Sequence, residues 1–241
     1  MIVDCIWEHN GNDTLLYAAN LPGAYSRGEN LQIAIAKMQQ EIKSYLLWSG
    51  YGVTDALEIR VVQDSACDLQ VSDADSDVLF DSERTPLTWD EYLRLKGLAL
   101  KSARNFLSLY DAIPDKSLCI GTARKTFYGL RPRSADQMYE HTKSVNAYYF
   151  GEIDVPADNE GTILECRVRG FEALEQKPHF LRNSLVEGSY GELWTVRKML
   201  RRFIWHDRIH AKAMYRLAVN LLVAENIPDL FYFGDTICTR R

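Results

Sequence analysis

The spacing of apolar residues changes along the chain, from short alternating runs near the N-terminus to long helical stripes after residue 87. In the first quarter, apolar runs alternate with polar residues and stop at turn residues such as Gly11 and Gly23, which predicts strands. Asn30 is a favourable N-cap for the helical stripe that follows it. The expected strands cover residues 2–8, 14–19, 24–28 and 57–62, with a helix over 31–48. This order predicts an α+β module over residues 1–65.

Residues 66–86 separate this module from the rest of the chain. The stretch is acidic and polar with few large apolar residues, a composition typical of a linker. Asp73, Asp75 and Asp77 have the spacing that begins a calcium-binding loop. Val78 occupies the position of the glycine that such a loop requires, and Arg84 that of its closing glutamate. We therefore expect a solvated acidic linker rather than a calcium site.

Four helical stripes follow, and each begins at a pair of residues that can form a capping box. The pairs are Thr88 with Glu91, Ser134 with Gln137, Thr162 with Glu165 and Ser189 with Glu192. A proline follows each stripe within a few residues and ends the helix there. Four amphipathic helices predict an all-α four-helix bundle over residues 87–241. The loops at 114–133 and 178–188 are long, so the sequence does not determine the order in which the helices pack.

The last of these helices, expected over residues 192–223, carries two histidines on its apolar face. At about 100° per residue, one stripe collects both histidines together with apolar side chains. Its members are Met199, Phe203, His206, His210, Ala213, Leu217 and Leu221, and the opposite, solvated side is expected to hold Arg197, Arg201, Arg208 and Lys212. Two imidazoles one helical turn apart can bind the same metal ion.

The second of the four helices supplies a third imidazole. His141 shares an apolar face with Met138, Val145 and Tyr148, so that it also points toward the core of the bundle. A buried imidazole needs a polar partner, and three neutral imidazoles that bind one cation satisfy this need together. Three protein ligands leave coordination positions open for water or substrate, as in catalytic metal sites.

With these motifs, residues 85–235 resemble the DinB-like (YfiT-like) metalloprotein superfamily. The matching residues are His141 in Tyr-Glu-His-Thr and the pair His206 and His210 in Trp-His-Asp-Arg-Ile-His. The resemblance implies a four-helix bundle whose three histidines bind a divalent metal ion, zinc or nickel in first place and iron as another option. It also implies a small-molecule substrate: in this family a low-molecular-weight thiol attacks an electrophile. The expected activity is therefore that of a metal-dependent thiol S-transferase.

The N-terminal module resembles the HicB-like antitoxin fold. The likeness depends on the run from Leu21-Pro22-Gly23 to Gly28-Glu29-Asn30, which leads into the helix at 31–48. The DNA-binding C-terminal piece of that family has no visible counterpart in this sequence. An alternative function follows from this resemblance, in which the module binds a protein partner and the protein is regulatory, with a structural or vestigial metal. A homodimer is also compatible with the sequence.

Composition and charge narrow the classes of function further. The chain has 241 residues, 46% hydrophobic and 25% charged, with a net charge of −5, which does not favour nucleic acid or an anionic membrane. Arg197, Lys198, Arg201 and Arg202 lack an accompanying aromatic platform, so we interpret them as a solvated helix face. No apolar run is long enough for a membrane span, the N-terminus lacks a basic region, and the five cysteines are scattered. These features predict a cytoplasmic protein.

Two more residues are candidate catalytic groups. Asp207 adjoins the histidine pair, where a zinc-protease helix would carry a glutamate base, but it projects about 100° away from His206. We therefore favour a surface ion pair, or a hydrogen bond to a metal-binding histidine, for Asp207 over the role of a base. Tyr148 lies about two turns after His141 on the same face. It is a candidate hydrogen-bond donor at the site, with core packing as the favoured alternative.

Overall fold

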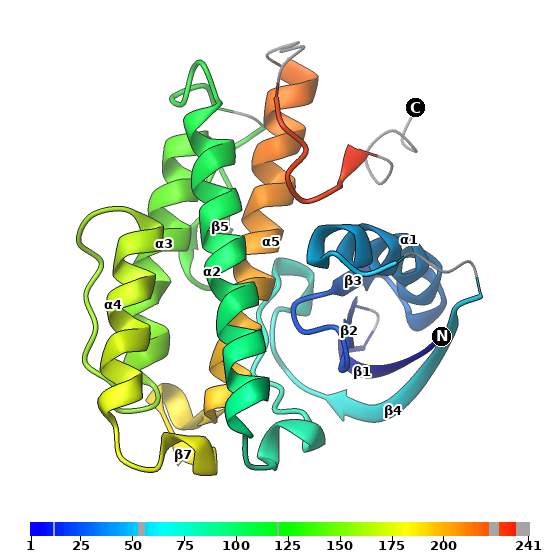
Figure 1. Ribbon diagram of the computed structural model, residues 1–241. Coiled ribbons are helices and arrows are strands. Elements are labelled where there is room, and N and C mark those ends of the chain that lie inside the picture. Colours follow the sequence, from blue (N-terminus) through cyan, green and yellow to red (C-terminus); the bar gives the residue numbers. More distant parts are fainter. Residues whose placement is uncertain (12, 53–55, 120, 222–226, 235–241) are drawn as a thin grey trace.

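A computed structural model describes the chain except residues 12, 53–55, 120, 222–226 and 235–241. Its first part is a mixed four-stranded sheet with one helix packed against it (Figure 1). The elements are β1 (Ile2–Asn10), β2 (Asp13–Ala18), β3 (Tyr25–Gly28), α1 (Leu31–Ser49) and β4 (Glu58–Ala66). The sheet order is β3-β2-β1-β4, in which β1 pairs antiparallel with β2 and parallel with β4. The predicted order of strands and helix is confirmed, and β4 extends four residues beyond the expected end.

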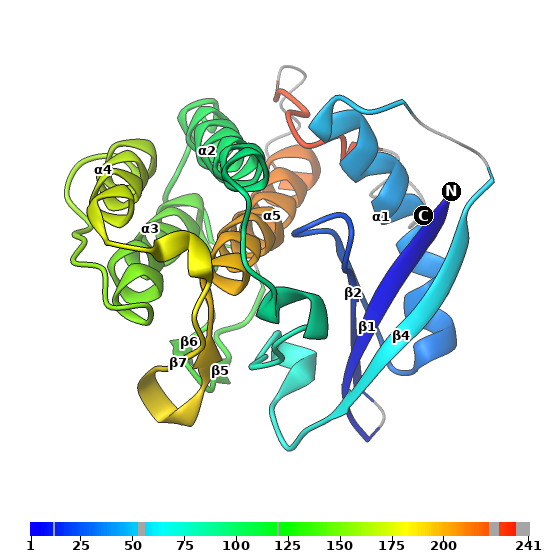
Figure 2. The ribbon, with the colours of Figure 1, turned by 60° about the horizontal axis from the view of Figure 1, so that its bottom comes forward.

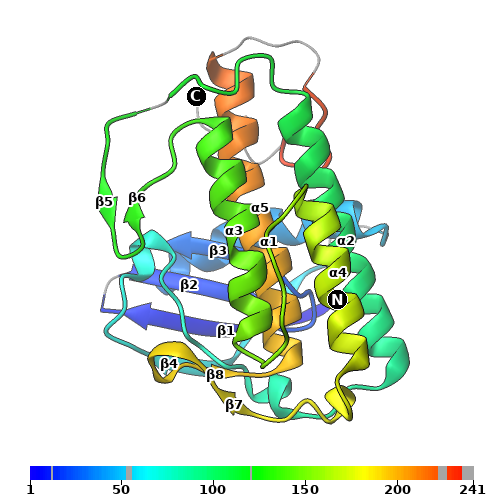
Figure 3. The ribbon, with the colours of Figure 1, turned by 90° about the vertical axis from the view of Figure 1, so that its left-hand side faces the viewer.

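Long helices follow in the remaining chain. They are α2 (Trp89–Asp111), α3 (Ala135–Gly151), α4 (Ile163–Gln176) and α5 (Val196–Leu221), with two short hairpins, β5 (Lys125–Thr126) with β6 (Gly129–Leu130) and β7 (Val186–Glu187) with β8 (Leu193–Trp194). Helix α2 packs on α4 and α5, and α3 packs on the same two helices (Figure 3). The protein therefore combines an N-terminal mixed sheet with a helical part, an α+β fold.

Three of the four predicted helix starts agree with the structure. Thr88 and Thr162 each accept a hydrogen bond from the backbone N–H three residues later, and the glutamate there bonds back, which completes both capping boxes. Ser134 caps α3 through its hydroxyl, while the Gln137 amide accepts from the backbone N–H of Arg133 instead. The sequence predicts these three helix starts correctly because a cap is a local interaction.

The predicted start of α5 at Glu192 is wrong. Residues Ser189–Gly191 form a 3-10 turn, and Tyr190 has a left-handed backbone conformation (φ 62°) that a helix does not accommodate. Strand β8 follows, and the helix begins only at Val196. Thr195 is the cap, because its Oγ1 accepts a hydrogen bond from the backbone N–H of Lys198 at 3.1 Å.

The expected solvated face of α5 is also wrong. The helix lies between the other helices and the N-terminal module (Figure 2), so that two of its faces are covered. Arg208 on the supposedly exposed side is fully buried and pairs with Glu41 of α1, with an Nη2–Oε1 distance of 2.6 Å. Lys212 pairs with the other oxygen of Glu41 at 3.2 Å. Close contact with the module requires Gly23, where a Cβ would lie 2.4 Å from Cγ2 of Ile204.

The segment expected to be an acidic linker packs against the first turns of α5. It contains two 3-10 helices, Val71–Asp73 and Asp81–Arg84. Arg201 of α5 forms a buried ion pair with Glu83, and Arg202 donates a hydrogen bond of 2.6 Å to the Ser76 carbonyl. Arg201, Arg202 and Arg208 are therefore buried rather than solvated, because this segment and α1 supply oxygen partners for them. Arg197 and Lys212 are partly exposed.

The Glu41 pair predicts a pH dependence of stability. Burial by itself raises the pKa of Glu41, but the charges of Arg208 and Lys212 outweigh it and lower the pKa below its ordinary value. A carboxyl with a lowered pKa in the folded state stabilises the fold above its unfolded-state pKa, and this contribution is lost as the pH falls through the folded-state pKa. We expect the free energy of unfolding to fall below about pH 4, less steeply in Glu41→Gln. Urea unfolding of both proteins between pH 7 and pH 3 measures this difference. The same pH dependence of the free energy of unfolding in the wild type and in Glu41→Gln would contradict the prediction.

Candidate metal centre

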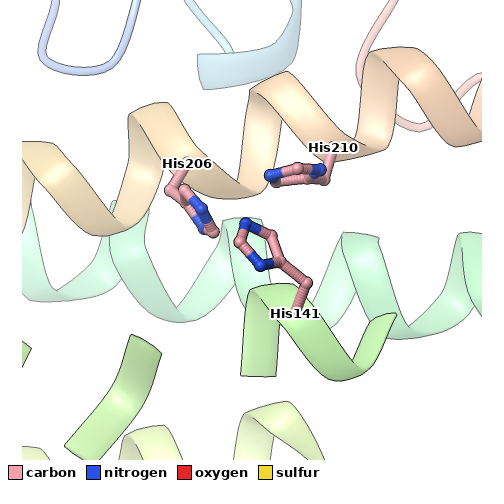
Figure 4. A group of neighbouring side chains, drawn as sticks. All are labelled: His141, His206 and His210. Carbon is pink, nitrogen blue, oxygen red and sulfur yellow. The ribbon is translucent and has the colours of Figure 1, made fainter. Parts of the chain in front are cut away.

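Three histidine side chains meet between helices α3 and α5 (Figure 4). His141 comes from α3, and His206 and His210 come from successive turns of α5. One nitrogen from each ring can be chosen so that all three lie within 4.8 Å of one another. The ring centroids of His206 and His210 are 4.6 Å apart, and that of His141 lies 5.1 Å from the first and 4.7 Å from the second. The three predicted residues therefore lie close enough to bind one metal ion.

The protonation state of the cluster suits metal ligation. Burial lowers the pKa of all three imidazoles, and for His206 the neighbouring His210 and His141 lower it further. The imidazoles are therefore neutral at pH 7, the form in which a ring nitrogen has a lone pair for a metal.

One buried nitrogen of the cluster lacks a protein partner. Nδ1 of His206 is shielded from solvent and has no hydrogen bond to any residue that the structure describes. Leaving a buried polar atom unsatisfied costs about 1–3 kcal/mol, so such atoms are uncommon. A bound cation would compensate for burial of the cluster, and a set of three imidazoles fits zinc, nickel or iron.

The histidines lie on the wall of a cavity of about 790 Å³. Its other walls come from β3, the segment at residues 72–77, the region of the β5–β6 hairpin, and the remaining turns of α3 and α5. Tyr128, in the turn between β5 and β6, places its ring 4.8 Å from that of His141. The cavity thus leaves space for a substrate directly beside the cluster, as open coordination positions require.

The two other candidate residues occupy different environments. Asp207 is fully buried and forms an ion pair with Arg167 of α4 at 3.3 Å, while Ser102 of α2 donates a hydrogen bond to it. Its carboxylate does not line the cavity, so the ion pair is present but is buried rather than at the surface. Tyr148 does line the cavity, is 37% exposed, and contacts Trp194 edge-on.

Sequence reasoning missed the residues that complete the cavity from outside the two helices. Arg27 extends from β3, while Tyr128 and Arg131 belong to the loop between α2 and α3. Residues on loops have no periodic spacing, and their approach to the cluster depends on how distant segments pack. No signal in the sequence distinguishes them from other exposed residues.

Comparison of the chain with protein-family models, curated proteins and solved structures finds no match in any of the three. Among the residues that the structure describes, no helix combines the length and apolar content needed to cross a bilayer.

Proposed function

We propose that this protein is a metal-dependent enzyme that binds a divalent ion through His141, His206 and His210 and activates a low-molecular-weight thiol. The observation that carries the proposal is the convergence of the three imidazoles on the wall of an open cavity. A purely structural metal site is normally closed by four protein ligands. Within the described residues, the only group of three or more metal-ligating side chains is this trio, and it adjoins space for a substrate.

The chemistry depends on what the metal and the chain each supply. A divalent ion held by three imidazoles lowers the pKa of a thiol or water in its remaining coordination positions. His206 and His210 are held in place by α5, whose rigid turns fix their spacing. In the proposed transfer, the thiol sulfur forms a bond to an electrophilic carbon, and the leaving group departs with its bonding electrons and takes up the thiol proton.

The arrangement of α2, α3, α4 and α5 supports assignment of the helical part to the four-helix bundles of the DinB-like class. That class was suggested by one histidine from an earlier helix and a pair from the last, and α3 and α5 occupy those places in the helix order. We further propose a HicB-like origin for the N-terminal module, since its strand and helix order follows the expected one. Both assignments depend on residue patterns and element order alone.

Cobalt substitution tests the proposed function. Protein without a histidine tag, stripped of metal and supplied with Co²⁺, is expected to bind about one ion per chain in a site of low coordination number. Addition of 2-mercaptoethanol should then shift the visible spectrum, because a thiolate enters an open position. Cobalt binding without any response to thiols would instead favour the alternative, a regulatory protein whose metal is structural.

A further inference from the structure

Two arginines that are distant in sequence line the histidine cavity. Arg27 belongs to β3 of the N-terminal module, and Arg131 follows β6 in the loop between α2 and α3. Both arginines therefore share the lining of one cavity with His141, His206 and His210.

Neither arginine is neutralised by a carboxylate of the described chain. Arg27 donates a hydrogen bond of 3.2 Å to the backbone carbonyl of Ser72, which leaves its positive charge uncompensated. Arg131 forms no side-chain hydrogen bond or ion pair within the residues that the structure describes. Arg124, in the same wall, differs because it pairs with Asp73.

Among the residues that the structure describes, no acidic residue of the cavity forms an ion pair with Arg27 or Arg131. Of the four in the lining, Asp73 and Glu192 already form ion pairs with other basic side chains. Asp75 accepts a hydrogen bond of 3.3 Å from the backbone N–H of Gln70 and forms no ion pair with either arginine in the described structure. Asp77 is the remaining acid, and within the described structure no ion pair joins it to either arginine.

A second cavity of about 630 Å³ adjoins the first. Five residues line both: Tyr25, Arg27, Ser72, Lys212 and Arg216. Of these five described residues three are basic, and one of the three, Lys212, pairs with Glu41. A ligand larger than a simple thiol can extend from the histidines past Arg27 into this space.

We propose that Arg27 and Arg131 bind a carboxylate group of the small-molecule substrate beside the three-histidine site. The inference rests on the proposed function and names the substrate class, a thiol that carries a carboxylate. Guanidinium groups suit this role because their planar fork donates two parallel hydrogen bonds to a carboxylate. The N-terminal module, through Arg27, thereby supplies part of the binding site.

A pair of thiols that differ in charge tests the proposal. The cobalt-substituted protein is titrated with 3-mercaptopropionate and with 2-mercaptoethanol, and the two dissociation constants are compared as a ratio. We expect the wild type to bind the carboxylate thiol more tightly, and Arg27→Gln with Arg131→Gln to lower this preference about tenfold or more. Intrinsic differences between the thiols cancel when the ratios of the two proteins are compared.

Arg169→Gln is the matched control, since Arg169 is a half-exposed arginine of α4 outside the cavity. It should retain the wild-type ratio, and both variants should bind cobalt as the wild type does. An unchanged ratio in the double variant, with cobalt binding intact, would overturn the carboxylate proposal alone. Failure of the wild type to bind cobalt would overturn the proposed function and this inference with it.

Discussion

Replacement of both His206 and His210 by alanine is expected to abolish metal binding, from about one ion per chain to none, because one remaining imidazole cannot hold the ion. The variant should stay largely helical, since both positions lie within α5, where alanine is the most favourable residue. Metal analysis after dialysis and far-ultraviolet circular dichroism measure the two outcomes. A chelator should lower the melting temperature of the metal-loaded wild type and leave the double variant unchanged, because bound metal stabilises only the folded state.

His9→Ala with His179→Ala is the matched control for this experiment. His9 pairs with Asp64 on the sheet, and His179 precedes a short 3-10 helix, so that both lie outside the cluster. The control should bind metal as the wild type does. Stoichiometric metal in the His206 and His210 variant would show that the ligands are elsewhere.

The second large effect is expected at the buried ion pair between the module and α5. Glu41→Gln leaves Arg208, which is fully buried, without its carboxylate, and also removes the partner of Lys212. Breaking a buried pair by removal of one partner costs about 3–5 kcal/mol, because the remaining charge is desolvated without compensation. We expect the free energy of unfolding in urea at pH 7 to fall by this amount.

An exposed pair in the same module provides the comparison. Asp4 and Arg60 form an ion pair of 2.6 Å across β1 and β4, and both side chains are at least a third exposed. Asp4→Asn should change the free energy of unfolding by less than about 1 kcal/mol, because water screens exposed charges. Equal losses in Asp4→Asn and Glu41→Gln would contradict the account of α5 as a helix buried on two sides.

The two parts of the chain differ in how much the sequence could predict. In the N-terminal module the order of strands and helix is correct, because alternation, turn residues and the Asn30 cap are local signals. Three helix starts in the second part are correct for the same reason. At Ser189 the local pattern fits a cap equally well, yet the chain forms a hairpin there and Thr195 caps α5 instead.

The basic face of α5 shows where sequence patterning fails. Helical periodicity separates apolar from charged positions and assigns the charged ones to solvent. Arg201 and Arg208 are buried because Glu83 and Glu41, distant in sequence, reach them. No spacing rule contains this information, since it depends on how the module and the segment at residues 67–86 pack against the helix.

The candidate site was predictable only in part. The histidine trio is visible in the sequence because all three residues lie on apolar faces of helices, where a polar side chain is conspicuous. The cavity around the trio could not be predicted from the sequence, because Arg27 and Arg131 come from a strand end and a loop. Helical periodicity therefore identifies the candidate metal ligands. The residues that surround these ligands depend on tertiary packing, which the sequence pattern does not show.

The proposed function requires that His141, His206 and His210 bind the same metal ion. The most direct test is an anomalous-scattering map from crystals of protein without a histidine tag, recorded at the absorption edge of the metal found by elemental analysis. We expect one strong peak about 2.0–2.2 Å from a nitrogen of each imidazole. A map with no peak among the three rings, in crystals of metal-supplemented protein, would contradict it.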